Sequence, residues 1–219
     1  PLCPEVDMGI GLPRETMRLE QHGHEIRRVA PKTAADHTDR LRTFAAQRLA
    51  ALSQERLCGY ILKKDSPSCG MERVRLYPTT GVPNRTGQGL FAAPLMHCFP
   101  HLPVEEEGRL HDPRLRENFV TRVFAYQRWG QMAEQKITRA ELLRFHAQHK
   151  FVLVAHSQVG TRRVGRLLAH PEQFTDEQAW AAAYLDGFSE VMRRTPTRRG
   201  HTNVLQHLAG YVADHLVRD

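Results

Sequence analysis

The sequence predicts two successive parts, an α/β domain over residues 1–103 and an all-helical domain over residues 104–219. In the first part, a helical pattern, a short apolar run and a glycine- and proline-rich loop follow one another, which is typical of an α/β sheet. After Pro100 the sequence pattern changes, and apolar residues recur at the helical period in almost every segment. We therefore expect a mostly parallel, incomplete sheet in the first domain and helices alone in the second.

A β-hairpin is expected first in the α/β part. Residues 17–20 and 26–29 flank Gly23, which supplies the flexibility of a turn. Apolar residues then recur at helical spacing between Thr33 and Arg56, and the apolar run Leu57–Leu62 predicts a buried strand. The other expected elements are a strand over residues 72–77, a loop over residues 81–89 and a helix over residues 90–99.

The second part predicts helices throughout. Thr138 lies three residues before Glu141, which is the spacing of a capping box. Trp129, Trp180 and Tyr184 occur at helical spacing among apolar neighbours, and we expect them in the core. The expected helices lie near residues 113–129, 138–157, 158–169, 175–194 and 201–217.

Composition and charge narrow the class of protein. The 219 residues carry a formal net charge of +7. Residues 1–103 contribute +4 (14 basic, 10 acidic) and residues 104–219 contribute +3 (17 basic, 14 acidic). Because the charge is spread, it suits an anionic substrate at least as well as nucleic acid. With no run of about 18 apolar residues and no signal peptide, we expect a cytoplasmic protein without a membrane partner.

The four cysteines differ in their settings. Without a secretion signal we expect all of them to be reduced. Cys58 lies in an apolar run, where cysteine acts as a small hydrophobic residue, and Cys98 ends an apolar helical pattern. Cys3 and Cys69 instead lie in proline- and glycine-rich turns beside acids, hydroxyls and lysines. These two are the candidates for chemistry.

The segment Ser66-Pro67-Ser68-Cys69-Gly70 follows a predicted strand and two lysines. Ligands of open α/β sheets bind beyond the carboxyl ends of strands. Nearby cations favour the thiolate, and thiolates are ligands for zinc and iron–sulfur clusters. The residue types leave two interpretations open, a metal-binding Cys69 or a buried, inert Cys69 in a tight turn. Two thiols are also fewer than the four ligands that zinc or a cluster usually takes.

Ordered motifs give the chain a resemblance to known families. In the first part these motifs are Cys3-Pro4-Glu5-Val6, Gly11-Leu12-Pro13-Arg14-Glu15, and Gly59-Tyr60-Ile61-Leu62-Lys63 leading into Ser66–Gly70. In this order they are similar to the thiouracil desulfidase (TudS) family. The second part resembles the YbgA-like helical domain that is often fused behind it, on Pro103–Leu110, Asn118-Phe119, Arg122–Tyr126 and Phe145–Lys150.

The resemblance implies a 4Fe–4S cluster held by three cysteines, with the fourth iron open to take sulfur from a thiolated pyrimidine. Cys3 and Cys69 match two of the three ligands, and Cys58 and Cys98 match none. The third ligand of the family belongs to a Cys-Leu segment near its amino terminus, which this chain lacks. We therefore expect the chain as given to bind a cluster poorly. Its carboxyl terminus also ends earlier than is usual in the family.

The implied reaction replaces sulfur by water, and that step needs a base and a proton donor within hydrogen-bond reach. Glu5 is the carboxylate nearest a ligand in the sequence, and we assign it the role of base or proton shuttle. Ser66 or Ser68 would orient the pyrimidine or the water, although Ser66 also suits a loop cap. If the substrate is a nucleotide, the candidate phosphate contacts are Arg14, Lys63 and Lys64.

Other functions remain open at this point. The main alternative is an RNA-binding accessory protein with the basic run Arg193–Arg199 as its contact surface, whose affinity would fall steeply with salt. A desulfidase would instead need iron, sulfide and exclusion of oxygen. A redox or structural iron–sulfur protein would have all its irons closed by protein ligands. His146 and His149 have metal-binding spacing but no matching partner, so we expect them on a polar helix face.

Overall fold

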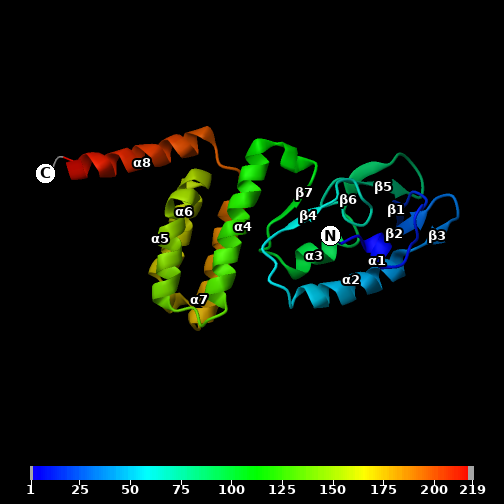
Figure 1. Cartoon of the computed structure of the whole chain (residues 1–219), viewed down its shortest axis with the longest axis horizontal. Helices are drawn as coiled ribbons and strands as arrows, with labels where there is room; N and C mark the ends of the chain where they lie inside the picture. The colour runs from blue at the N-terminus through cyan, green and yellow to red at the C-terminus, as the bar shows by residue number, and fades with distance from the viewer. Residues whose placement is uncertain (1, 217–219) are drawn as a thin grey trace. The chain divides into compact units, whose positions relative to one another are not determined.

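The computed structural model describes residues 2–216. The chain divides into two compact units between Pro113 and Arg114, here called unit 1 and unit 2. Unit 1 combines strands with helices, whereas the described part of unit 2 is helical (Figure 1). The predicted class, an α/β part followed by an all-helical part, is confirmed.

The strands of unit 1 form one five-stranded sheet and one separate pair. They are β1 Arg18–His22, β2 Glu25–Ala30, β3 Ala35–Asp36, β4 Tyr60–Leu62, β5 Val74–Pro78, β6 Asn84–Gly87 and β7 Val104–Glu106. The sheet has the order β3-β2-β1-β5-β6, and β4 pairs with β7. The pairs β1–β5 and β4–β7 are parallel, whereas the hairpin β1–β2 and the edge strands β3 and β6 add antiparallel pairs.

The β1–β2 hairpin forms where the sequence predicts it. Gly23 in its turn has a φ of +63°, which glycine adopts without steric penalty. Leu19 of β1 is fully buried and packs against two apolar residues of β5. Because side chains alternate along a strand, the neighbours Arg27 and Arg28 of β2 point to opposite faces. The Arg27 side chain is 43% exposed and that of Arg28 is 1% exposed.

Three helices belong to unit 1: α1 Pro4–Asp7, α2 Thr38–Leu52 and α3 Ala92–Cys98. Helix α2 packs against α1, α3 and β2. Its buried residues Leu41, Ala45, Leu49 and Leu52 lie three or four positions apart. This is the spacing from which the helix is predicted, and it places one continuous apolar stripe against the rest of unit 1.

Two local predictions are wrong. The segment expected to be a loop over residues 81–89 contains strand β6, which pairs with β5 although three of its four residues are exposed. The strand expected over residues 57–62 forms only at β4, and Ile61 in its middle is 55% exposed. A short apolar run does not show which of its faces the fold will cover.

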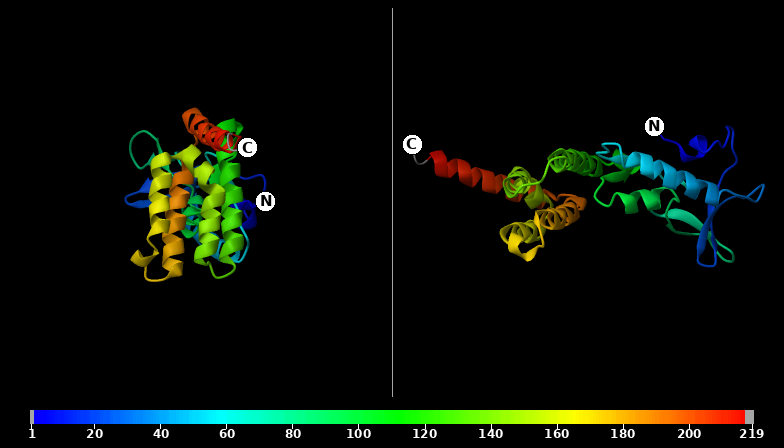
Figure 2. Two further views of the ribbon diagram at one scale, coloured as in Figure 1. Left: turned by 90° about the vertical axis from the view of Figure 1, so that its left-hand side faces the viewer. Right: turned by 90° about the horizontal axis from the view of Figure 1, so that it is seen from below.

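Unit 2 holds long helices close to their predicted positions (Figure 2). The capping box of α5 is confirmed, because the Thr138 hydroxyl accepts the Glu141 N–H at 3.3 Å and the Glu141 carboxylate accepts the Thr138 N–H at 2.9 Å. The helices are α4 Pro113–Ala133, α5 Arg139–His156, α6 Gln158–Ala169, α7 Glu177–Arg193 and α8 Arg198–Leu216, with a short 3-10 turn at Pro171–Gln173. Another 3-10 turn, Arg109–His111, lies at the end of unit 1.

An aromatic cluster forms the core of unit 2, as predicted for Trp129, Trp180 and Tyr184. Trp129 and Tyr184 stack with ring centroids 5.9 Å apart, and Phe145 meets Trp129 edge-on at 5.3 Å. Helices α4 to α7 lie side by side around this cluster, and α8 leads away from them (Figures 1 and 2).

The expectation of a polar helix face at His149 is wrong. His149 is 2% exposed and its ring centroid lies 4.2 Å from that of Phe145. Its Nδ1 is 2.7 Å from the Phe145 carbonyl oxygen, and this hydrogen bond offsets the loss of water on burial. His146 forms a hydrogen bond with the Tyr184 hydroxyl at 3.2 Å. Both histidines therefore belong to the packing of unit 2.

Among residues 2–216, no helix is long and apolar enough to cross a membrane.

Candidate functional site

Cys3 and Glu5 are positioned by the short helix α1. Cys3 precedes the helix in extended conformation, and Pro4 occupies its first position, where the missing N–H costs nothing. The helical turn brings the carboxylate of Glu5 back toward the thiol, and the Cys3 Sγ lies 3.4 Å from Glu5 Oε2. Glu5 itself is 8% exposed. The segment expected to be a plain turn is thus a helix start that pairs a thiol with a buried acid.

The loop Ser66–Gly70 is organised by Ser66. Its hydroxyl oxygen accepts the backbone N–H groups of Ser68 at 3.2 Å and of Cys69 at 3.1 Å. Its carbonyl oxygen accepts the Gly70 N–H at 2.8 Å. Ser66 therefore caps the turn that presents Cys69, and this is the structural role that the sequence left open beside a role in binding.

The same loop is fastened to the start of α3. The Ser68 carbonyl oxygen accepts the N–H groups of Phe91 at 2.9 Å and of Ala92 at 3.1 Å. The backbone of Gly89 approaches so closely that a Cβ there would lie 2.4 Å from the Ser68 carbonyl oxygen. Only glycine permits this contact, and through it the helix fixes the loop that carries Ser68 and Cys69.

Glu5 collects contacts from several segments that are distant in the sequence. The buried Ser68 hydroxyl donates to Glu5 Oε1 at 2.6 Å, and Arg28 Nη2 donates to the same oxygen at 3.3 Å. Arg14 Nη2 lies 4.0 Å from Glu5 Oε2. We call Glu5 with its four partners Cys3, Ser68, Arg14 and Arg28 the Glu5 cluster.

Electrostatics sets the protonation of this cluster. Burial raises the pKa of Glu5, but the Ser68 hydrogen bond, a backbone hydrogen bond and the Arg28 charge outweigh it, so the pKa lies below its usual value. Burial, together with the nearby Glu5 and Cys3, raises the pKa of the Cys69 thiol to about 12. The expectation that neighbouring lysines favour the Cys69 thiolate is therefore wrong for the protein without a bound metal.

The predicted lysines are held elsewhere. The Lys63 ammonium lies 2.7 Å from Glu107 Oε1, and the Lys64 N–H donates to Glu107 Oε2 at 2.7 Å. The Lys64 side chain runs alongside Gly108, where an added Cβ would meet its Cδ at 3.0 Å. Of the three candidate phosphate contacts, Arg14 lies beside Glu5, whereas the described contacts of Lys63 and Lys64 are with Glu107.

Arg28 is the member of the Glu5 cluster that sequence reasoning missed. The hairpin pattern places Arg28 in a strand over residues 26–29 and gives it no role. Because successive side chains of a strand point to opposite faces, one of two adjacent arginines turns inward when one face of the sheet is covered. The Arg28 side chain is 1% exposed, and among the described residues its buried Nε and Nη1 atoms have no hydrogen-bond partner.

The two candidate thiols lie near the Glu5 carboxylate. Cys3 and Cys69 are both half-buried, Cys3 Sγ donates to Glu5, and the Glu5 charge acts on Cys69. Among the described residues, no group of three or more His, Cys, Asp or Glu side chains could hold a metal ion. Cys58 is half-buried and its Sγ lies 3.6 Å from the Arg56 carbonyl oxygen, whereas Cys98 is exposed.

Comparison with known families agrees with this arrangement. Residues 1–107 match the model of the family described as 2-thiouracil desulfurase, and residues 150–219 match DUF1722, a family of unknown function. The chain is therefore similar to two families in succession, one over most of unit 1 and the other over the later part of unit 2. The desulfurase match extends through β7 and Glu107, the residue that holds the start of the Cys69 loop.

Two relatives are each similar to about half of the chain. The uncharacterized protein YbgA of Escherichia coli (strain K12) is 30% identical over 103 residues, which are 47% of this chain and 61% of that protein. The chain thus spans less than two thirds of this curated relative. A solved structure described as the 4Fe–4S-dependent thiouracil desulfidase TudS is 28% identical, and covers 52% of this chain and 70% of its own. Its TM-score of 0.38 is too low to compare the placement of individual residues.

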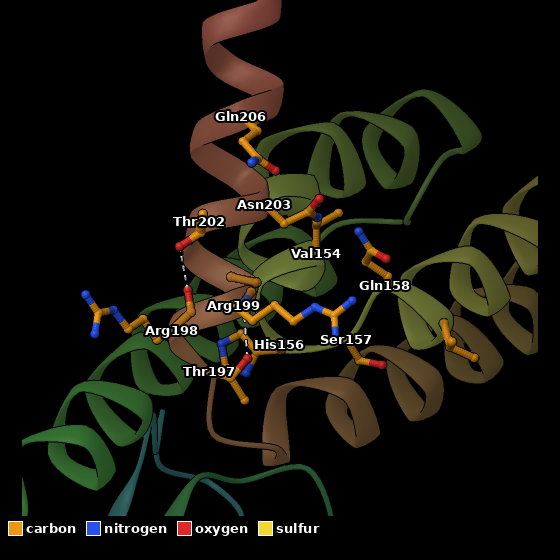
Figure 3. A pocket seen from close by; sticks show the side chains of 13 residues that line it. Val154, His156, Ser157, Gln158, Thr197, Arg198, Arg199, Thr202, Asn203 and Gln206 are labelled. Carbon is orange, nitrogen blue, oxygen red and sulfur yellow. Dashed lines mark hydrogen bonds between the residues drawn. The ribbon is translucent and has the colours of Figure 1, made fainter.

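Unit 2 contains a cavity of about 840 Å³ where α8 begins beside the junction of α5 and α6 (Figure 3). Among the described residues, its lining includes Arg198 and Arg199 from the predicted basic run and no acidic residue. Arg199 reaches across toward Ser157 and Gln158, whereas Arg198 points away (Figure 3). Part of the basic run therefore lines a hollow surface.

Proposed function

We propose that unit 1 removes sulfur from thiolated uracil or its nucleotide and replaces it with oxygen from water. The observation that carries this proposal is the Glu5 cluster, in which a buried carboxylate contacts a thiol from one motif and a hydroxyl from the other. The reaction is balanced by water alone: thiouracil and water give uracil and hydrogen sulfide.

The residues fit a sulfur-ligated metal group in part. Cys3 and Cys69 would hold the 4Fe–4S cluster implied by the motif resemblance, and a third ligand has to join them. The buried, unpartnered nitrogens of Arg28 suit an anionic group, and a thiolate-bound cluster is anionic because each ligand cysteine brings a negative charge. When bound, the cluster would supply an open iron that accepts the soft thiocarbonyl sulfur.

The chain's own residues then have distinct tasks. Glu5 is held as an acceptor by Ser68 and Arg28, and would take the proton of the water that attacks the carbon. Ser68 orients that carboxylate, and Ser66 shapes the loop through its backbone contacts. Arg14, whose side chain is 31% exposed, would meet a phosphate if the substrate is a nucleotide.

The test is anaerobic reconstitution, with iron and sulfide, of the chain extended at its amino end by a cysteine-containing segment, followed by incubation with 2-thiouracil and its nucleotides. Uracil and sulfide should appear together in equal amounts. Cys69→Ser should lose cluster and turnover together, because a hydroxyl is a poor substitute for a thiolate at iron. Cys98→Ser is the matched control, since Cys98 is exposed, and it should behave like the wild type.

A second arm tests the third ligand. The present chain should hold the cluster poorly, and a chain extended at its amino end by a cysteine-containing segment should regain the brown chromophore. Full and stable occupancy in the present chain would contradict this and return Cys58 or Cys98 to consideration. An intact cluster that releases no sulfur from any thiolated pyrimidine would instead favour a redox or structural iron–sulfur protein.

The cavity beside α8 favours RNA binding as a second candidate function, for unit 2. Arg199 reaches across this cavity, and its described lining residues include no acid, which suits phosphate groups. RNA affinity, measured by fluorescence anisotropy, should fall steeply with salt and weaken in Arg199→Gln. Arg163→Gln is the control, because Arg163 is paired with Glu190. Equal affinity of wild type and Arg199→Gln would remove the cavity from this function.

A further inference from the structure

The guanidinium of Arg28 is only partly used by the protein. Its Nη2 donates to Glu5, while the buried Nε and Nη1 have no hydrogen-bond partner among residues 2–216. The side chain is 1% exposed. A buried donor without a partner costs about 1–3 kcal/mol, and more when the group is charged. An arginine in this state indicates that an acceptor is missing from the protein alone.

The charges around Arg28 indicate the sign of that acceptor. The described groups coupled to it are the Glu5 carboxylate, the Arg14 guanidinium and the Cys69 thiol. In this cluster one carboxylate, Glu5, faces the guanidiniums of Arg14 and Arg28, so the arginine charges outnumber the carboxylate that they face. The nearby Cys69 side chain makes the surroundings better suited to a sulfur anion than to a hydrated oxyanion.

We propose that Arg28 is a positioning residue that also binds a sulfur anion in the Glu5 cluster. One of its nitrogens fixes the carboxylate, and the two others donate to sulfur at the oxidation level of sulfide. This inference rests on the proposed function, because desulfurisation by water releases the thiocarbonyl sulfur as hydrosulfide and a proton. The sulfur is either free hydrosulfide or sulfide held by a cluster, and the two arms of the experiment distinguish these sources.

The first arm uses the chain without metal, reduced and free of oxygen, and titrates it with sodium hydrosulfide against sodium chloride. Hydrosulfide should raise the thermal midpoint of the wild type at concentrations where chloride does not. Arg28→Gln should weaken the hydrosulfide affinity by about tenfold or more, since charge-assisted hydrogen bonds are lost. Arg28→Lys keeps the positive charge but loses the planar set of N–H donors, and its affinity should lie between those of Arg28→Gln and the wild type.

The matched control is Arg27→Gln. Arg27 is the same residue type on the same strand, but it faces the surface and pairs with Glu25 and Asp36. The affinity of the Arg27→Gln variant for hydrosulfide should stay within about twofold of the wild type, because the surface ion pairs of Arg27 lie outside the Glu5 cluster. If Arg28→Gln does not fold, the wild type and Arg28→Lys still decide the question. In that case the proposal is overturned if hydrosulfide does not stabilise the wild type and if Arg28→Lys and Arg27→Gln lose the cluster at the same rate in the second arm.

The second arm reconstitutes the cluster in the chain extended at its amino end. It follows the loss of the cluster to an iron chelator by visible absorbance. Faster loss from Arg28→Gln than from Arg27→Gln supports contact with cluster sulfide, and an effect in the first arm alone supports free hydrosulfide. No difference between the variants in either arm refutes the proposal. Hydrosulfide binding that depends on Arg28, without turnover of any thiolated pyrimidine, would defeat the proposed function and leave this inference standing.

Discussion

Replacing Gly89 by alanine should displace the loop that carries Ser68 and Cys69. The new Cβ would lie 2.4 Å from the Ser68 carbonyl oxygen and 2.8 Å from the Cys69 nitrogen, and both are backbone atoms that cannot rotate away. Reaching an ordinary contact distance requires a shift of about 1 Å. That shift weakens the hydrogen bonds from Phe91 and Ala92 to the Ser68 carbonyl. Overpacking and two weakened hydrogen bonds together predict a loss of about 2–4 kcal/mol in unit 1.

Two measurements check this value. Chemical denaturation of unit 1 should begin at lower denaturant, and peptide mapping after thiol labelling should show faster modification of Cys69. Gly11→Ala is the control, because a Cβ at Gly11 would meet no atom within 4 Å. If Gly89→Ala unfolds and labels like Gly11→Ala, the loop is not held by α3, and the account of how Cys69 is positioned is wrong.

Three further predictions concern the acid, the histidines and a helix cap. In a cluster-bearing protein, Glu5→Gln should keep the cluster and lose about 10²–10⁴-fold in turnover, and a full rate would make the carboxylate structural. Burial lowers the pKa values of His146, His149 and His156, so below about pH 6.5 the unfolded chain binds more protons than the folded chain. The urea midpoint of unit 2, followed by its two tryptophans, should therefore fall as the pH drops from about 7 to 5, and a constant midpoint would contradict this. Thr138→Ala should cost unit 2 about 1 kcal/mol in the same urea assay, and an unchanged midpoint would show that the capping box adds nothing.

Periodicity in the sequence is enough to place most helices. Helix α6 forms over the predicted residues, and α2 follows its apolar stripe, because a buried helix face leaves a regular trace in the sequence. The strand β6 leaves no such trace. It is polar, lies at the sheet edge and depends on pairing with β5, which is a contact between segments and not a local pattern.

The candidate site divides in the same way. Cys3, Glu5, Ser68 and Cys69 stand in two recognisable motifs, and the structure brings Glu5 against both Cys3 and Ser68. Arg28 lies outside these motifs, and its role depends on which face of β2 turns inward. His149 shows the opposite error, because a residue that is usually polar is buried once a neighbouring carbonyl accepts its hydrogen bond.

Strand β7 also bears on how the two halves of this protein can be exchanged with those of other proteins. Glu107, the residue that follows β7, accepts the Lys64 N–H, and Glu106, the last residue of β7, accepts the Met71 N–H at 2.8 Å. These two glutamates therefore hold both ends of the loop that carries Cys69. A cut after residue 103 would leave the loop in one fragment and the two glutamates in the other. A transplantable module built on unit 1 therefore has to run at least to Glu107, and a recombination point after Pro113 keeps both glutamates with the loop that they hold.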